Sequence, residues 1–332
     1  MWEKKGQKPV AEVVPSSRLL SQEKEGEAEE TLQTGRLSAP LPRLNPGRVD
    51  SKSAVMYSPF SGEDMLHGAG GRNESRARKN KSPLLLVARS DADRDILNAH
   101  RTSVVAKKFS EINDIYQTIA ENGGDAAVEQ KLGAERHRRI IENLQKATDQ
   151  TTQLGLLQIK SNQTGQELNK LDPANTKIYI IAHGLAGDNE LTSTLNGREQ
   201  TISASALARQ LADGGLSKDF IDFRLLSCQS ADVETPVSFQ QGASSDAAPQ
   251  GFFSSIRERM GLKNQSFAES FANALLNEGF KCAQVSGYHG NYIVNIGSDH
   301  QVRVINKEGR VVESARQSHV RRVFFGTKGG RA

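Results

Sequence analysis

Two apolar segments of this chain, each ending at a small or reactive residue, limit its possible folds more than any other feature of the sequence. Residues 177–184 read KIYIIAHG and residues 220–230 read FIDFRLLSCQS, and both favour buried strands. The segment between them, ISASALARQLADGG, has Ser203 as a good helix N-cap and Gly214 as a good helix end. Strand, helix and strand in this order predict a parallel sheet with helices on its faces.

Further segments continue this pattern. We expect strands over residues 84–88, 154–160 and 280–287, and helices over residues 104–119, 134–146 and 266–279, the last opened by a Ser-Glu capping box. After residue 291 the sequence alternates as short strands, with NKEG as a hairpin turn. The prediction is an α/β fold, a mostly parallel sheet flanked by helices, with an antiparallel hairpin extension at the C-terminus.

Residues 1–81 are predicted to form a disordered arm, so that the ordered domain covers residues 82–332. Six of the ten prolines lie in the first 60 residues, among Ser, Glu, Gly and Arg without a sustained period. Such a composition buries too little apolar surface to offset the entropy of ordering the chain. The basic stretch 72–81 is interpreted as a flexible linker, because it has no interleaved aromatic residues for base stacking.

Composition excludes several classes of protein. No apolar run approaches the ~20 residues that span a bilayer, so we expect no membrane span. The N-terminus has no apolar core of a classical secretory signal. Two cysteines are too few for a disulfide framework or a Cys-rich zinc site, and no metal is expected. A net charge of +4 is mild, and we expect no nucleic-acid partner.

A reactive pair stands at the ends of the two strongest strands. In open α/β sheets, active sites form beyond the carboxyl ends of the strands, where His183 and Cys228 are expected. A nearby imidazole lowers the pKa of a thiol or takes its proton. Gly184 has no Cβ and leaves its N–H available for an oxyanion. The pattern predicts Cys228 as nucleophile and His183 as its base.

Simpler interpretations stay open beside this one. Cys228 is equally the kind of small residue that packs at a strand end, and a histidine alone is common in turns. Cys282, in the middle of an expected strand, is predicted to pack in the core. Asp188 and Asp222 are both possible partners of His183, and the sequence does not single out a third catalytic residue.

The central block resembles the autoprocessing cysteine protease domain of large bacterial toxins, the MARTX and clostridial glucosylating toxins, in the caspase-like clan CD. The matching elements are IIAHG, TISASALARQL and LLSCQS, followed in order by SFAESFANALL, CAQVSG and a C-terminal β-flap. The resemblance covers roughly residues 82–332 and is strongest over 177–287. It implies a caspase-like fold, with Cys228 as nucleophile and His183 as base.

The same resemblance implies allosteric activation by inositol hexakisphosphate, bound in a basic pocket that includes the flap. Arg and Lys suit multidentate phosphate contacts, and the C-terminal strands are rich in them. The expected ligand-binding residues are Lys107, Arg303, Lys307, Arg310, Arg321 and Arg322. A solvated sheet surface explains the same residues, and a charged helix face explains Lys107.

Together these features predict a cysteine endopeptidase that cleaves itself or a host protein. The resemblance implies leucine before the cut, with Leu37 or Leu66 as candidate self-cleavage sites, and a small effector secreted into or translocated to the host cytosol. Residues 231–265 are longer than the family's loop after the cysteine. The alternative is a catalytically silent protease-like scaffold that binds a polyphosphate or a protein partner.

Overall fold

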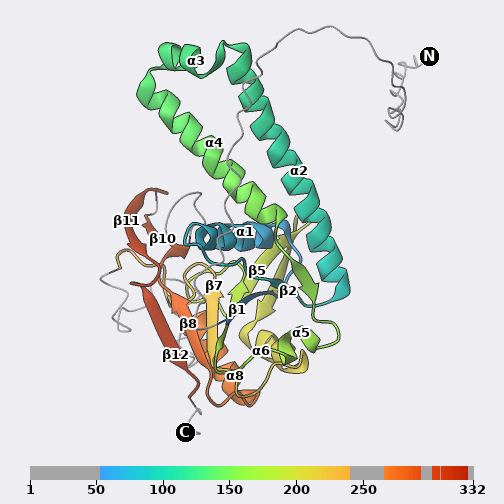
Figure 1. Ribbon diagram of the computed structural model, residues 1–332. Coiled ribbons are helices and arrows are strands. Elements are labelled where there is room, and N and C mark those ends of the chain that lie inside the picture. The colour runs from blue at the N-terminus through green and yellow to red at the C-terminus, as the bar shows by residue number, and fades with distance from the viewer. Residues whose placement is uncertain (1–52, 240–264, 293–300, 307, 328–332) are drawn as a thin grey trace, which may run out of the picture. The chain divides into compact units, whose positions relative to one another are not determined.

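The centre of the fold is a seven-stranded sheet. The computed structural model describes residues 53–239, 265–292, 301–306 and 308–327 of the 332-residue chain. The sheet has the strand order β12-β8-β7-β4-β1-β2-β3 (Figure 1), and every neighbouring pair except β12–β8 is parallel. The strands are β1 (Ser53–Ser58), β2 (Leu86–Ala88), β3 (Ile159–Ser161), β4 (Thr176–Ile181), β7 (Asp222–Leu226), β8 (Gln284–Tyr288) and β12 (Arg321–Phe325). This confirms the expected α/β fold with a mostly parallel sheet.

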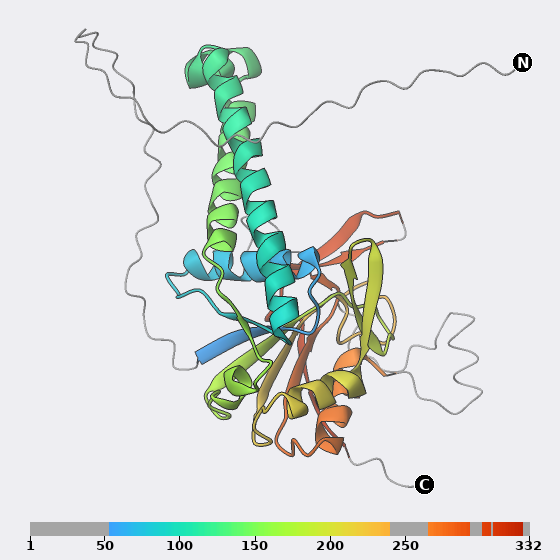
Figure 2. The same ribbon diagram turned by 90° about the vertical axis from the view of Figure 1, so that its right-hand side faces the viewer.

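Helices cover both faces of the sheet (Figures 1 and 2). On one face lie α1 (Glu63–Ala77) and α4 (Ala134–Gly155), and on the other lie α6 (Ala204–Asp213) and α8 (Phe267–Asn277). Phe223 of β7 meets Phe271 of α8 edge to face, with ring centroids 5.9 Å apart. The predicted caps are confirmed, because Ser203 accepts from the N–H of Ala206 and Ser266 from that of Glu269.

The prediction that residues 1–81 are disordered is wrong over 53–77. Strand β1 lies inside the sheet between β4 and β2, and its Met56 is fully buried. The glycines of α1 are packing residues rather than linker residues, since a Cβ at Gly68 would lie 2.8 Å from the Ile181 side chain. Leu66 is fully buried in α1, which removes it as an accessible cleavage site, and Leu37 lies outside the described residues.

Three smaller predictions also need correction. The helix expected over residues 104–119 is α2, which spans Asp91–Glu121, and the helix expected over 134–146 is α4, which runs on to Gly155. The strand expected over 154–160 is therefore short and is β3, Ile159–Ser161. The remaining helices are α3 (Gly124–Leu132) and α5 (Gln166–Asn169). The segment before α6 is a hairpin of β5 (Glu190–Leu195) and β6 (Arg198–Ser203), turned by Asn196 and Gly197 at φ of 52° and 74°.

The C-terminal strands divide between two sheets. Strands β9 (Asn291–Tyr292), β10 (Gln301–Ile305) and β11 (Val311–Arg316) form a small antiparallel sheet, which we call the flap. The predicted hairpin turn is present, since the N–H of Gly309 donates to the carbonyl of Asn306. Strand β12 does not belong to the flap, because it pairs antiparallel with β8 at the edge of the main sheet.

Candidate active site

The structure brings His183 and Cys228 together at neighbouring strand ends. Parallel strands β4 and β7 pair Ile181 with Leu226, and each reactive residue lies two positions further along its strand. Continued two residues past the strands, this register would set the backbone of His183 beside that of Cys228, at the ~4.8 Å spacing of adjacent strands. His183 is half exposed and Cys228 is half buried, so both are within reach of a substrate.

Gly184 is fixed between these two residues. A Cβ at this position would lie 2.9 Å from the Cys228 carbonyl oxygen and 3.4 Å from the Ser227 side chain, so only glycine allows the approach. Within the part of the chain that the structure describes, the Gly184 N–H donates no hydrogen bond. An available N–H beside the cysteine is the arrangement that stabilises an oxyanion.

Asp64 orients the imidazole of His183. Its Oδ2 lies 2.9 Å from His183 Nε2, and the same carboxylate accepts from Ser193 Oγ at 2.8 Å and from the Thr194 N–H at 3.1 Å. The Asp64 hydrogen bond raises the pKa of His183, and partial burial opposes it. Burial of Asp64 favours a higher pKa, but the hydrogen bonds from His183, Ser193 and Thr194 outweigh it and lower the pKa. With Nε2 bound to Asp64, Nδ1 is the nitrogen left to act as base.

Sequence reasoning missed Asp64 because it assigned the whole segment to a disordered arm. The available signal was the short run AVMYS at residues 54–58, followed by two acidic residues of a helical first turn. The two acids named from the sequence have other contacts. Asp188 accepts from the Glu190 N–H, and Asp222 pairs with Arg224 at 2.8 Å.

The turn after Cys228 has a backbone that is unusual for a side-chain-bearing residue. Gln229 has a φ of 49°, the left-handed region, which costs about 1–2 kcal/mol for a residue other than glycine. Two contacts hold it there: its N–H donates to the Gly290 carbonyl at 2.8 Å, and its side-chain oxygen accepts from the Ala186 N–H at 2.9 Å. The position of Cys228 is therefore set by loops on both sides of it.

A second histidine flanks Cys228 on the side opposite His183. His289 follows β8, the other neighbour of β7, and its Nδ1 lies 2.5 Å from Asp232 Oδ1. Asp232 also accepts from the Gly290 N–H at 2.8 Å, and its carbonyl accepts from the Gly187 N–H at 2.9 Å. The His289 side chain is 14% exposed, against 56% for His183, so His183 is the more accessible base.

The start of the long segment after the cysteine contacts the flap. Glu313 of β11 accepts from Ser238 Oγ at 2.7 Å and from the Phe239 N–H at 2.8 Å, and these bonds lower the pKa of Glu313. A Cβ at Gly290 would lie 2.9 Å from the Phe239 ring, so this loop also packs against the residue that holds Gln229. Residues 240–264 lie outside the described residues.

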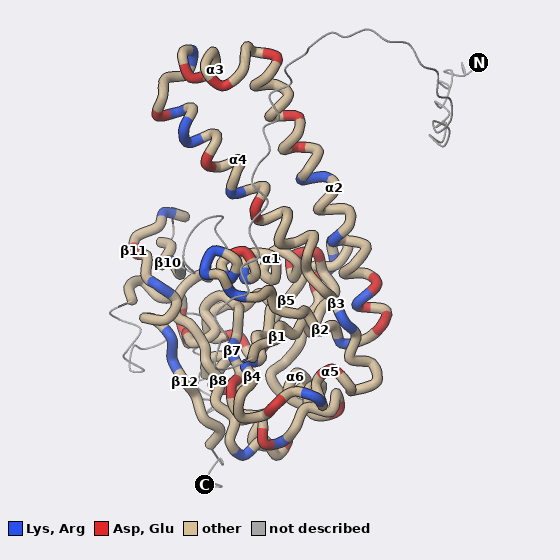
Figure 3. The backbone as a smooth tube through the Cα atoms, in the orientation of Figure 1, with Lys and Arg blue, Asp and Glu red and all other residues tan. Residues whose placement is uncertain are grey.

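The five described residues among the six predicted to bind inositol phosphate do not form one pocket. Consecutive strand residues point to opposite faces, and β12 pairs Arg321 with Tyr288 but Arg322 with Gly287. Lys107 lies on α2, which packs beside β2 and β3 at the other edge of the sheet (Figure 3). Six strand spacings of about 4.8 Å separate that edge of the sheet from β12, so α2 lies far from the arginines of β12.

The remaining members of the set lie on the flap or beyond the description. Arg310 is exposed in the turn between β10 and β11, and Lys307 lies outside the described residues. Arg303 of β10 is half buried, and its Nε has no hydrogen-bond partner.

Instead, the structure gathers cations around two buried tyrosines on the α1 face of the sheet. The guanidinium of Arg72 lies 4.2 Å from the ring centroid of Tyr179, and that of Arg224 lies 5.8 Å from it. Burial favours a raised pKa for Tyr179, but the charges of Arg72, Arg224 and Lys177 outweigh it and lower the pKa. Burial raises the pKa of Tyr288, against the opposing charges of Arg224, Arg72 and Arg321. We call Arg72, Lys177, Arg224 and Arg321 the basic cluster.

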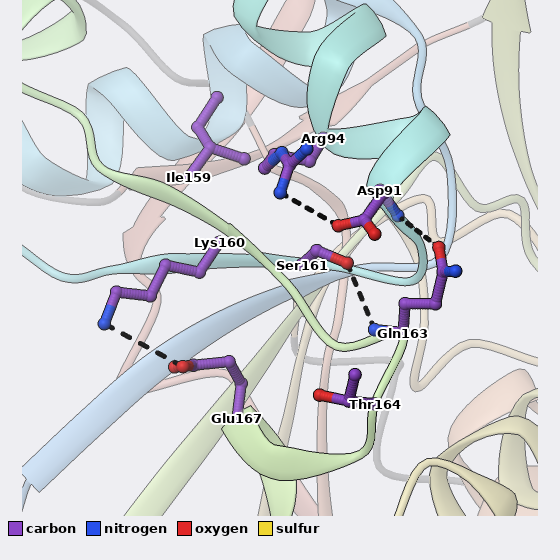
Figure 4. A pocket seen from close by; sticks show the side chains of 8 residues that line it. All are labelled: Asp91, Arg94, Ile159, Lys160, Ser161, Gln163, Thr164 and Glu167. Carbon is purple, nitrogen blue, oxygen red and sulfur yellow. Dashed lines mark hydrogen bonds and ion pairs between the residues drawn. The ribbon is translucent and has the colours of Figure 1, made fainter.

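A cavity beyond β2 and β3 lies away from these residues (Figure 4). Its charged groups already pair with one another, Arg94 with Asp91 at 2.8 Å and Lys160 with Glu167 at 3.8 Å. Two further strands, β1 and β2, separate β3 from the strand that carries His183. This cavity is therefore not part of the candidate site.

The prediction that Cys282 packs in the core is wrong. Strand β8 begins two residues after Cys282, so this cysteine lies in the preceding turn, where it is exposed. Among the described residues, no group of three or more His, Cys, Asp or Glu side chains is placed to hold a metal ion. Over the same residues, no helix combines the length and apolar character needed to cross a bilayer.

Comparison with known proteins gives no relative for this chain: no family model matches it, and neither a curated protein nor a solved structure matches it.

Proposed function

We propose that the protein is a cysteine endopeptidase with Cys228 as nucleophile and His183 as general base. The observation that supports this proposal is the pairing of β4 with β7, which ends two residues before both His183 and Cys228, together with the bond between the His183 imidazole and Asp64. The resemblance of the same segments to the cysteine protease domain of bacterial toxins supports the same reaction.

The proposed reaction has two halves. His183 Nδ1 takes the proton of the Cys228 thiol, and the thiolate attacks the carbonyl carbon of a peptide bond. The Gly184 N–H stabilises the resulting oxyanion, and His183 returns its proton to the leaving amine as the C–N bond breaks. Water then attacks the thioester, with His183 as base, and releases the new carboxylate and the thiol.

The first experiment separates an enzyme from a silent scaffold. It uses the Cys282→Ser background, because the exposed Cys282 thiol would otherwise react with any alkylating probe. We expect iodoacetamide to alkylate Cys228 at least tenfold faster than in a His183→Ala variant, since the imidazole maintains the thiolate. A peptide library incubated with the full chain should show cleavage that Cys228→Ala abolishes.

Two results would reject the peptidase. Equal alkylation rates with and without His183 would mean that the imidazole does not activate the thiol. Absence of Cys228-dependent cleavage, from the library or from the chain itself, would favour the scaffold that binds a polyphosphate or a protein partner. N-terminal sequencing of the incubated protein distinguishes self-processing from cleavage of another chain.

We further propose inositol hexakisphosphate as an activator bound at the basic cluster. Four cations converge there on one face, although Arg224 is also paired with Asp222 at 2.8 Å. Arg303 of the flap has a buried Nε without a hydrogen-bond partner among the described residues. The loop that follows Cys228 is bonded to the flap through Glu313, so a ligand that orders the flap would act on the turn at Gln229.

A thermal melt tests this activator. At about 100 times the dissociation constant, the ligand should stabilise the protein by about 2.7 kcal/mol, beyond a sulfate control at equal ionic strength. Arg72→Gln should reduce the shift, whereas Arg139→Gln, on an exposed position of α4, should leave it unchanged. A shift no larger than that of sulfate would remove the activator and leave the peptidase proposal intact.

A further inference from the structure

Asp232, four residues beyond Cys228, is a buried carboxylate in the turn that follows β7. It is 4% exposed, and both of its oxygens are bonded. Oδ1 lies 2.5 Å from His289 Nδ1, and Oδ2 accepts from the Gly290 N–H at 2.8 Å. A buried charge is costly unless it is paired and hydrogen-bonded, so this side chain is fixed against the segment that follows β8.

The main chain around Asp232 is fixed against a different segment, the loop that follows His183. The Gly187 N–H donates to the Asp232 carbonyl at 2.9 Å. Gly187 has a φ of 69°, and a Cβ at this position would lie 2.3 Å from the Val233 carbonyl oxygen. The two segments therefore approach each other too closely for any residue but glycine.

Asp232 also closes the turn that begins at Cys228. Its N–H donates to the Gln229 carbonyl at 2.9 Å, and Gln229 is the residue held at a φ of 49°. The Gln229 side chain in turn accepts from the Ala186 N–H, in the loop after His183. One residue therefore joins three segments, which follow β4, β7 and β8. Its displacement would move Cys228 relative to His183.

We infer that Asp232 is a positioning residue, which fixes His183 and Cys228 relative to each other. This inference rests on the proposed peptidase function. Because Asp232 is buried, it acts through the segments that it joins, and this role needs hydrogen bonds rather than charge. In Asp232→Asn the amide oxygen can accept from the Gly290 N–H, and the NH₂ can donate to Nδ1 of a neutral His289. A second catalytic Asp–His pair, by contrast, would need the carboxylate charge.

The first arm of the test measures peptide cleavage by full-length variants, at a temperature below the Tm of each. Asp232→Ala should lower kcat by about tenfold or more and change KM by less than about threefold, because misplaced reacting groups slow the chemical step without removing a substrate contact. Asp232→Asn should keep kcat within about threefold of wild type. An equal loss in the two variants would overturn the inference in favour of an electrostatic role, and a wild-type kcat in Asp232→Ala would overturn it outright.

A matched control separates positioning from the loss of a buried loop contact in general. Asn162, which follows β3, is 5% exposed, and its amide donates to the Gly214 carbonyl at 2.8 Å and accepts from the Leu168 N–H at 3.0 Å. Strands β1 and β2 separate β3 from β4, which carries the candidate base. Asn162→Ala should therefore leave kcat and KM unchanged. A loss of kcat as large as that of Asp232→Ala would reject the positioning role.

The second arm measures the separation of the two residues without catalysis. In the full-length Cys282→Ser background, His183→Cys introduces a thiol on the strand next to that of Cys228, and a backbone spacing of about 4.8 Å suits a disulfide. Equilibration with oxidised and reduced glutathione gives the effective concentration of the two thiols. Asp232→Ala should lower this concentration by about tenfold or more, and Asp232→Asn by less than about threefold.

This second arm distinguishes the two proposals. If the difference between the Asp232 variants persists while the wild type cleaves nothing, the peptidase proposal fails and the positioning role stands. Equal effective concentrations with and without Asp232→Ala, or no disulfide in either protein, would reject the positioning role whatever the outcome of the cleavage assay.

Discussion

The contact between Asp64 and His183 leads to the sharpest prediction. In Asp64→Asn, one amide oxygen replaces the carboxylate oxygen that faces His183 Nε2 and the Thr194 N–H, and the new NH₂ faces Ser193 Oγ, which can accept. The hydrogen bonds with His183, Thr194 and Ser193 are therefore retained, while the negative charge and the bond from the Met65 N–H to Asp64 Oδ1, at 3.1 Å, are removed. Any change in the histidine then reports on electrostatics rather than on lost packing.

The size of the effect follows from Coulomb's law. Two unit charges about 4 Å apart interact by about 4 kcal/mol at an effective dielectric of about 20, and by about 1 kcal/mol in bulk water. The His183 side chain is 56% exposed and that of Asp64 is 21% exposed, so solvent screens much of the attraction. We take about 1 to 2 kcal/mol for the imidazolium, which corresponds to a rate loss of roughly 5- to 30-fold.

The assay measures alkylation of Cys228 in the Cys282→Ser background, together with an NMR titration of the His183 ring. In Asp64→Asn the pKa of His183 should fall toward its ordinary value of 6.5, because the hydrogen-bonded anion that raises it is gone. Asp188→Asn is the matched control, since within the described residues the Asp188 carboxylate accepts from the Glu190 backbone N–H alone. An unchanged His183 titration with an unchanged alkylation rate would show that Asp64 merely begins a helix.

The same pair makes stability depend on pH. His183 has a raised pKa in the fold, so its contribution is present below 6.5 and is lost as pH rises through the raised value. Asp64 has a lowered pKa, so its contribution is present above 3.8 and is lost as pH falls through the lowered value. The difference in Tm between wild type and Asp64→Asn should therefore be largest between pH 3.8 and 6.5.

Three further substitutions test the site and its support. Gly184→Ala should lower Tm and, below that Tm, slow peptide cleavage at least tenfold, because its Cβ would lie 2.9 Å from the Cys228 carbonyl; wild-type cleavage would contradict the oxyanion role. His289→Asn should change the alkylation rate less than about threefold, and a dead but folded variant would make His289 the base. Gly68→Val should lower Tm by roughly 2 to 10 °C through its clash with Ile181, and an unchanged Tm would show that α1 does not pack there.

Local pattern alone determined the two strands that carry the reactive residues and the helix between them. The runs before His183 and Cys228 are apolar enough to be buried strands, and Ser203 and Ser266 cap their helices by contacts three residues away. Such contacts are short in sequence, so the residue types themselves encode them. The turn at Asn196 and Gly197 was equally local, and its Asn-Gly signal was available in the sequence.

Only the tertiary structure decided which distant residues complete the site. Asp64 and Ser193 are 129 residues apart in the chain, and their contact depends on β1 inserting between β4 and β2. The glycine-rich helix that follows β1 has the composition of a linker, and its glycines are explained by the side chains packed against them, Ile181 at Gly68 and Leu154 at Gly70. The alternation of side chains along β12 likewise separated Arg321 from Arg322, since neighbours in sequence face opposite sides of a sheet. The sequence could therefore propose His183 and Cys228 as a pair, but the carboxylate beside His183 and the basic cluster depend on strand order and register, which no short segment encodes.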